Sequence, residues 1–278
     1  MIEMVCVVRW FARGGALALW LMLFSQQSYA GAWLQTADKS QIIFSGTWTE
    51  ANRRFDNTGT PRSSGRFTKQ EFNTVFERGL SDTLTVIGGI NARHQAIPTP
   101  TLYADGLRLH AASLAMFAGG RVKLWSGSQS VLSLQGLIQG NGERSFPHSP
   151  FKQDAPVEAE IRLLAGHSFN LASIPTFVDL QTAYRWRGGL KTDELRFDAT
   201  IGIRPVPHLL LMVQAFNSAT AIQDRQSGSK RAMQHKVQVS AVYDMNERWA
   251  LQGGLFSSIK GRETLRERGI LVAVWRKL

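Results

Sequence analysis

Apolar and polar residues alternate along most of the chain after about residue 39. Within 157–165 the odd positions carry Val, Ala, Ile, Leu and Ala, whereas the even positions are mostly charged. The segments 195–204 and 236–244 follow the same rule, with apolar side chains on one face and mostly polar side chains on the other. Because successive side chains of a strand point to opposite faces, this period of two predicts β-strands with one apolar face.

Such segments follow one another to the C-terminus. Most are about 10–13 residues long, which is typical of membrane-crossing strands, whereas strands of soluble proteins usually have about 5–6 residues. The predicted strands are 40–51, 66–78, 82–94, 110–124, 129–140, 156–168, 176–187, 193–204, 208–219, 233–245, 248–259 and 266–277.

The connections between these strands alternate in length. The tight connections are 80–82, 126–128, 170–175, 205–207 and 245–247. The longer ones are 52–65, 95–109, 141–155, 219–231 and 260–265, and the link near residues 188–189 is a short exception. Outer-membrane barrels have short periplasmic turns and longer outer loops. The sequence therefore predicts an all-β fold, a transmembrane antiparallel up-and-down β-barrel of about 12 strands in the bacterial outer membrane, with both termini periplasmic.

A soluble β-sandwich would also alternate, but the strand lengths and the placement of aromatic residues favour the membrane. Aromatic residues gather near the predicted strand ends, where a membrane-interface belt would lie. These residues are Trp48, Phe76, Trp125, Tyr184, Trp186, Tyr243, Trp249 and Trp275. No run after the leader is long and apolar enough for a membrane-spanning helix, so the sequence excludes a helical membrane protein.

Residues 1–30 have the features of a cleaved signal peptide. Arg9 and Arg13 precede an apolar run over 14–24, and Ser28 and Ala30 supply small residues at a cleavage site after Ala30. A permanent anchor is the alternative, but a spanning helix needs about 20 apolar residues. We therefore expect 31–278 to form a single barrel domain, with residues 31–38 as a short periplasmic lead-in.

The cysteine content and the net charge limit the kinds of site and partner that the mature chain can have. The one cysteine, Cys6, lies in the leader, which excludes disulfides, cysteine metal sites and cysteine nucleophiles from the mature chain. The leader also contains Arg9, Arg13 and Glu3, so the formal net charge of +11 falls to +10 on cleavage. The expected partners are outer-membrane lipid, lipopolysaccharide and anionic solutes or polymers, whereas nucleic acid is not expected for a secreted barrel. No cofactor or metal is predicted.

Charged residues on the predicted inward faces are the candidate binding residues of the lumen wall. They are Arg93, Arg121, Glu158, Glu160, Arg162, Asp179, Arg185, Arg196, Asp198 and Arg204. Further inward cations are Lys123 and Arg187. Two interpretations stay open: the charges pair with one another as a structural wall, or the arginines bias a pore toward anions. A barrel of this size has a narrow lumen that side chains partly fill, which favours small solutes.

Antiparallel pairing predicts specific partners within this wall. We expect Glu158 opposite Arg185, and Gln181 opposite both Arg162 and Asp198, with a possible slip of two residues. Such neighbours would form ion pairs and amide hydrogen bonds across the strands.

Catalysis is a less favoured alternative. Barrel phospholipases use a His and a Ser two residues apart, whereas here His148–Ser149 and His167–Ser168 are adjacent pairs and would point to opposite faces. No carboxylate cluster or metal-ligand spacing suggests another reaction. We therefore expect no enzyme, with an outer-membrane lipid hydrolase as the minor alternative.

The predicted outer loops are basic. Their cations are Arg53, Arg54, Arg62, Arg144, Lys152, Arg225, Lys230, Arg231, Lys260, Arg262 and Arg266. These charges are either ordinary solvated loop residues or docking groups for lipopolysaccharide or acidic polysaccharide.

Several phrases resemble a known family. They are Gly31-Ala32-Trp33, FERGLSDTLT at 76–85, PTFVDLQ at 175–181, AVYD at 241–244 and AVWRKL at 273–278. Together they resemble the XagA-like family of proteobacterial outer-membrane proteins over most of the mature chain. The resemblance implies a barrel associated with exopolysaccharide or biofilm matrix, and no catalytic signature comes with it. It favours a channel or export component, with a plugged structural or matrix-binding barrel as the alternative.

Overall fold

The computed structural model describes residues 31–98, 108–146, 157–188, 192–220 and 232–278. The residues 31–278 form one compact unit. The predicted leader lies outside the described residues, as do the pair His148–Ser149 and the loop cations Lys152, Arg225, Lys230 and Arg231. No helix in the described part of the chain is long and apolar enough to cross a membrane.

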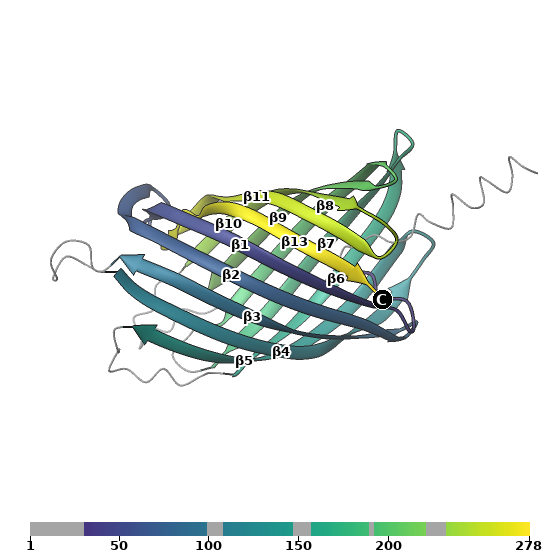
Figure 1. The fold of residues 1–278 in the computed structure, drawn as a ribbon, viewed down its shortest axis with the longest axis horizontal. Coiled ribbons are helices and arrows are strands. Elements are labelled where there is room, and N and C mark those ends of the chain that lie inside the picture. Colours follow the sequence, from purple (N-terminus) through teal and green to yellow (C-terminus); the bar gives the residue numbers. More distant parts are fainter. Residues whose placement is uncertain (1–30, 99–107, 147–156, 189–191, 221–231) are drawn as a thin grey trace, which may run out of the picture. The chain divides into compact units, whose positions relative to one another are not determined.

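Antiparallel strands surround a lumen and close on themselves (Figure 1). The strands are β1 (Ser40–Phe55), β2 (Pro61–Ser81), β3 (Leu84–Pro98), β4 (Arg108–Ser126), β5 (Ser130–Phe146), β6 (Val157–Leu171), β7 (Ile174–Arg187), β8 (Glu194–Val206), β9 (Leu209–Thr220), β10 (Met233–Asp244), β11 (Trp249–Arg262), β12 (Thr264–Leu265) and β13 (Arg268–Lys277). The short β12 and β13 both pair with β1 and occupy one position in the wall, so the described residues form a closed barrel of 12 strands.

The barrel closes between its first and last strands. β1 pairs with β2 on one side and with β13 on the other, and the amides and carbonyls of Ser40 and Leu278 bond to each other at 2.8 and 3.1 Å. Closure leaves no free sheet edge, a condition for β-structure in lipid. Both chain ends of the barrel lie at the end with tight turns, called the terminal end here, and the opposite end is called the loop end.

All 12 predicted strands are confirmed, but several extend further toward the loop end. The prediction 66–78 corresponds to Pro61–Ser81, and 129–140 corresponds to Ser130–Phe146. Alternating hydrophobicity marks only the apolar band, whereas backbone pairing continues into polar sequence beyond it. Among the tight turns, Ala172 and Ser173 have φ values of 48° and 68°, and positive φ at two successive residues is typical of the type I′ hairpin turn.

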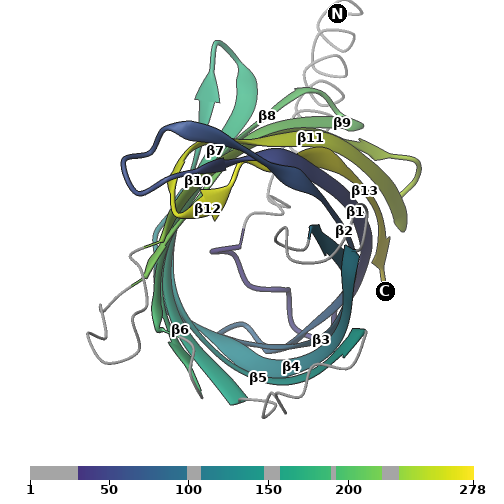
Figure 2. The same ribbon diagram turned by 90° about the vertical axis from the view of Figure 1, so that its left-hand side faces the viewer.

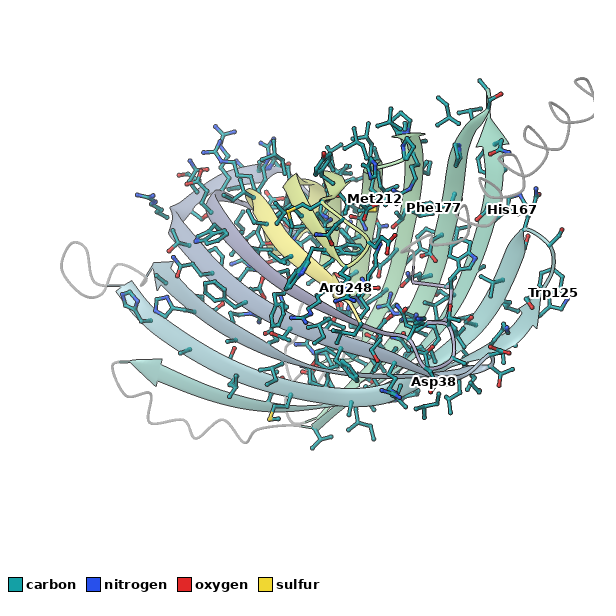
Figure 3. The ribbon with its side chains drawn as sticks, turned by 45° about the vertical axis from the view of Figure 1, so that its right-hand side comes forward. Asp38, Trp125, His167, Phe177, Met212 and Arg248 are labelled. Atoms are coloured by element: carbon teal, nitrogen blue, oxygen red, sulfur yellow. The ribbon has the colours of Figure 1, made fainter. Side chains whose placement is uncertain are left out.

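The outer face of the wall is apolar. Its exposed side chains include Phe44, Phe72, Ile90, Met116, Ile138, Ile161, Phe197, Ile201, Val213 and Leu255. In the predicted aromatic belt, Trp48, Trp125, Trp186 and Tyr243 are exposed, and Trp125 lies near the terminal end of its strand (Figure 3). An apolar exterior on a closed barrel suits a lipid environment.

The prediction that Trp275 belongs to the aromatic belt is wrong. Its side chain is buried, and its Nε1 donates to Oε1 of Gln252 at 3.1 Å. On β13 the buried positions are Ala273 and Trp275, so Trp275 lies on the inward face. The indole N–H explains this position, because it gains an amide acceptor inside the barrel.

Candidate functional site

The largest group of inward charges lies on β6, β7 and β8, and it is called the β6–β8 network here. Arg162 lies at its centre, with its Nε 2.9 Å from Glu160 and its Nη1 2.6 Å from Asp198. Arg185 approaches the other oxygen of Glu160 at 2.8 Å. Glu158 lies in reach of Arg187 at 3.5 Å. The carboxylates and Arg162 are buried, so each charge depends on its partners for stabilisation.

The strand register differs from the prediction by two residues at one interface. Glu158 lies opposite Arg187, and Glu160, rather than Glu158, lies opposite Arg185. A slip of two keeps every side chain on its predicted face, so the alternation pattern cannot detect it. At the next interface, Gln181 lies opposite Asp198 as predicted.

Gln181 meets Arg162 by a diagonal contact. Its cross-strand partner on β6 is Leu164, not Arg162. Nη1 of Arg162 nevertheless donates to Oε1 of Gln181 at 2.6 Å. The predicted contact is therefore present although the predicted register is wrong, because a long guanidinium side chain reaches the diagonal neighbour.

Arg196 has weaker contacts than the other arginines of this network. Its Nη1 is 3.6 Å from Glu160, and its Nε is buried with no hydrogen-bond partner. Oδ1 of Asp198 is also buried without a partner. Both atoms are shielded from the lumen, whereas the Arg196 side chain as a whole is 27% exposed, so a solute would meet the outer part of its guanidinium rather than its Nε.

Other predicted wall residues also pair. Arg93 donates to Glu71 at 2.7 Å toward the loop end. Arg204 donates to Asp244 at 2.8 Å and to the carbonyl of Pro207 at 2.7 Å near the terminal end. The inner wall therefore balances its arginines with carboxylates, and the sequence-based alternative of a paired structural wall describes most of it.

The segment 31–37, called the inner segment here, lies inside the ring of strands (Figure 2). The amide of Ala32 donates to Oδ2 of Asp179 at 2.8 Å, and the carbonyl of Ala32 accepts from Ser133 at 2.7 Å. Nη1 of Arg121 donates to the carbonyl of Trp33 at 3.0 Å. Ala32 is 0% exposed and Asp179 1% exposed. Side chains of β4, β5 and β7 thus satisfy the backbone of this segment.

Trp33 fixes the inner segment by packing. Its ring meets Phe177 edge-on with centroids 6.0 Å apart, and it covers a small apolar cluster that contains Val131 and Leu164. The ring also lies against Gly166, where a Cβ would overlap it. A glycine is therefore required under the indole for a close approach.

Further along, the inner segment reaches the wall of β1, β2 and β3. The amide of Gln35 donates to Oγ1 of Thr85 at 3.0 Å, and its side chain donates to Gln41 and Glu77. Glu77 in turn accepts from Arg121 at 3.0 Å. The segment therefore crosses much of the lumen near the terminal end.

Sequence reasoning predicted only a lead-in for residues 31–38 and missed this internal position. One signal was present in Asp179, whose cross-strand neighbours are Gly166 and Thr200 rather than a cation. A buried carboxylate without an opposing cation needs other donors. The amide of Ala32 and the side chain of Gln181 supply them.

Toward the loop end, the lumen holds a cavity of about 480 Å³. Seven strands line it, namely β1, β2 and β7 to β11. Its polar lining includes Asn73, Arg185, Arg196, Lys236 and Gln238. The cavity is polar and open to the rest of the lumen, so it can hold water or a small polar solute.

The catalytic groupings considered in the sequence can be compared with the geometry of the described residues. No group of three His, Cys, Asp or Glu side chains in the described part of the chain could hold a metal ion. His167, also visible near the strand end in Figure 3, bonds through Nδ1 to Oγ of Ser130 at 2.7 Å rather than to Ser168. Among the described hydrogen bonds, no carboxylate orients this histidine.

Comparison with known proteins shows the fold. No family model and no curated protein matches the chain. The COG4313 outer membrane channel from Pseudomonas putida F1 has a TM-score of 0.64 at 13% identity, over 91% of this chain and 100% of that one. The transport unit of the autotransporter AIDA-I from Escherichia coli has a TM-score of 0.55 at 7% identity, over 90% and 91%. The translocator domain of NalP from Neisseria meningitidis has a TM-score of 0.51 at 10% identity, over 98% and 97%.

The chain has the fold of a bacterial outer-membrane β-barrel. Its closed antiparallel wall of 12 strands and its apolar exterior agree with this likeness. Only closed barrels satisfy every backbone group of a sheet within lipid. The protein is therefore located in the bacterial outer membrane.

Proposed function

We propose that the protein is a narrow outer-membrane channel for small polar or anionic solutes. The observation that carries this proposal is the polar cavity of about 480 Å³ inside the wall, where cationic and amide side chains from several strands, together with Glu71 and Glu194, form the lining. A water-filled lumen with polar side chains is the usual conducting path of outer-membrane barrels. The structural likeness to an outer membrane channel is consistent with this function.

Arg196 supports an anion preference. Most inward arginines are held by carboxylates at 3.0 Å or less, whereas Arg196 lies 3.6 Å from Glu160 and borders the cavity. A guanidinium with free donors can bind a passing carboxylate or phosphate. Paired cations contribute little to ion preference because neighbouring carboxylates compensate their field.

The resemblance to XagA-like proteins adds a biological context to the proposal. A barrel of that kind would act in the export or retention of exopolysaccharide and biofilm matrix. A cavity of this size suits single sugars or short anionic segments rather than a folded polymer.

Planar-bilayer recording of the purified, folded protein in a salt gradient tests the channel. We expect a steady, low conductance whose reversal potential shows a preference for anions. A folded barrel that gives no current would contradict the proposal, whereas a cation preference would contradict only the role of Arg196.

A second candidate is a plugged barrel that serves as a structural or matrix-binding protein. The observation in its favour is the inner segment, whose backbone bonds to Asp179, Ser133 and Arg121 across the lumen. This candidate predicts a silent barrel, and it assigns matrix retention to the loops. Shortening 52–65 and 219–231 would then reduce retention of matrix by cells.

A further inference from the structure

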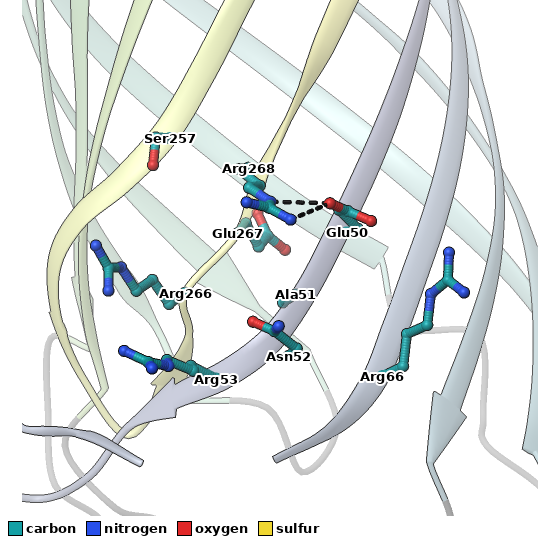
Figure 4. A pocket seen from close by; sticks show the side chains of 9 residues that line it. All are labelled: Glu50, Ala51, Asn52, Arg53, Arg66, Ser257, Arg266, Glu267 and Arg268. Carbon is teal, nitrogen blue, oxygen red and sulfur yellow. Dashed lines mark hydrogen bonds and ion pairs between the residues drawn. The ribbon is translucent and has the colours of Figure 1, made fainter. Parts of the chain in front are cut away.

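A second basic site lies at the loop end, where β1, β2 and β11 to β13 meet (Figure 4). Arginine side chains surround a pocket of about 540 Å³ there. The arginines are Arg53, Arg66, Arg266 and Arg268, and all of them are exposed. This group is called the rim arginines here.

Three of the rim arginines have no carboxylate partner in the described part of the chain. Arg268 pairs with Glu50 at 2.6 Å, as Figure 4 shows. Glu267, the other acid of the pocket, is buried and accepts from Lys69 and Lys236. Among the described residues, Arg53, Arg66 and Arg266 form no ion pair. The site therefore carries uncompensated positive charge, unlike the lumen wall.

The pocket of the rim arginines borders the lipid-facing side of the wall. Glu50 and Arg268 are cross-strand partners. Two residues further from the loop end, and so on the same face, lie the partners Trp48 and Ile270, which are 40% and 45% exposed. Arg66 is exposed and precedes the buried Phe67, at the place where the register between β1 and β2 shifts. Charge and exposed apolar surface are thus adjacent on one face.

The apolar surface next to the pocket is continuous across strands. Leu255 on β11 pairs with Ile270, which pairs with Trp48 on β1. The ring of Trp48 meets Phe72 edge-on at 6.1 Å. Two residues along a strand cover about 7 Å, so this row begins one pleat below the cations.

We propose that the rim arginines and the apolar row below them form a binding site for lipopolysaccharide. Arg53, Arg66 and Arg266 bind its phosphates, since a guanidinium donates two parallel hydrogen bonds to a phosphate. Trp48, Phe72 and Ile270 pack against its acyl chains. A cation at the membrane interface remains hydrated and close to the lipid headgroups. The position of the rim arginines, next to the apolar row at the loop end, suits such an interface.

Lipopolysaccharide and soluble anions would use different parts of the site. An acidic polysaccharide or free phosphate would use the cations alone, whereas a phosphorylated lipid uses both the cations and the apolar row. The site is independent of conduction, because its residues lie on the outside of the wall. With both termini periplasmic, as expected from the even strand number, the loop end faces the lipopolysaccharide leaflet.

Equilibrium binding of fluorescent lipopolysaccharide to the full, folded barrel in detergent tests the site. The variant Arg53→Gln/Arg66→Gln/Arg266→Gln is expected to bind about tenfold more weakly or worse, because it loses several charge-assisted contacts. The matched control is Arg54→Gln/Arg62→Gln/Arg78→Gln, which also removes three arginines, each of which has a carboxylate partner. The control should bind like the natural chain.

Other outcomes would overturn the proposal. An equal loss in both triple variants would mean that net charge alone attracts the lipid. Full competition by inorganic phosphate, or equal binding of a dephosphorylated lipid A, would exclude recognition of a phosphorylated lipid. Trp48→Ser should also weaken binding, and no effect would exclude the apolar row. If the triple variant does not fold, the single change Arg266→Gln gives the same comparison against Arg62→Gln.

Discussion

At the scale of single residues, the lumen arginines fall into two kinds. Arg162 is buried between Glu160 and Asp198 at 2.9 and 2.6 Å. Arg196 has one distant carboxylate at 3.6 Å and an unsatisfied Nε. The first geometry stabilises the wall, and the second leaves a charge for solutes. Replacing each one separates these roles.

Arg196→Gln should reduce the anion preference of the channel and leave the barrel as stable as before. The change removes the least compensated positive charge of the β6–β8 network, and its contact with Glu160 is long. The reversal potential in a salt gradient measures the effect. An unchanged anion preference would show that this arginine does not set selectivity.

Arg162→Gln should instead destabilise the barrel by about 3–5 kcal/mol, the usual cost of removing one partner from a buried ion pair. It leaves Glu160 with Arg185 and deprives Asp198 of its cation. Urea unfolding of the protein in lipid vesicles measures this loss, with Arg196→Gln as the control. Equal stability of the two variants would contradict the distinction between them.

At the scale of elements, the sequence predicted the strands well because alternation records which face meets lipid. The register between β6 and β7 was not predictable in the same way, since a slip of two residues leaves both faces unchanged. The internal position of 31–37 was not predictable from periodicity either. It depends on Asp179, Ser133 and Arg121, which lie between 88 and 147 residues away from their partners in the inner segment.

The inner segment can be tested by thiol labelling, because the chain has no cysteine after Cys6. Ala32→Cys should react slowly with a soluble maleimide, since Ala32 is 0% exposed, whereas Asp38→Cys should react fast. Adding Gly166→Leu should raise the reactivity of Ala32→Cys, because the new side chain displaces Trp33. Equal labelling at positions 32 and 38 in the unmodified background would contradict the internal position.

At the scale of the whole molecule, paired and unpaired charges occupy different surfaces. Inside the wall, most arginines meet carboxylates, and the polar cavity lies between them. Outside, three rim arginines have no ion-pair partner among the residues that the structure describes, and they lie beside an apolar surface. Composition alone predicted a basic protein with anionic partners. Composition could not predict which surface carries the unpaired charges, because pairing depends on which strands become neighbours.

The pairing of charges inside the wall also bears on the proposed anion preference. A lumen whose charges are mostly paired is a weak electrostatic filter, so selectivity depends on a few residues such as Arg196. The inner segment occupies part of the lumen near the terminal end, and the polar cavity lies toward the loop end. In the proposed channel, the inner segment therefore limits the conductance.

The most direct test of this claim is the single-channel conductance of the intact protein beside a variant that lacks residues 32–37. We expect a small steady current for the intact barrel and a clearly larger one for the variant, because the deletion removes the side chains and backbone that cross the lumen. Equal currents, or silence from both folded proteins, would contradict it.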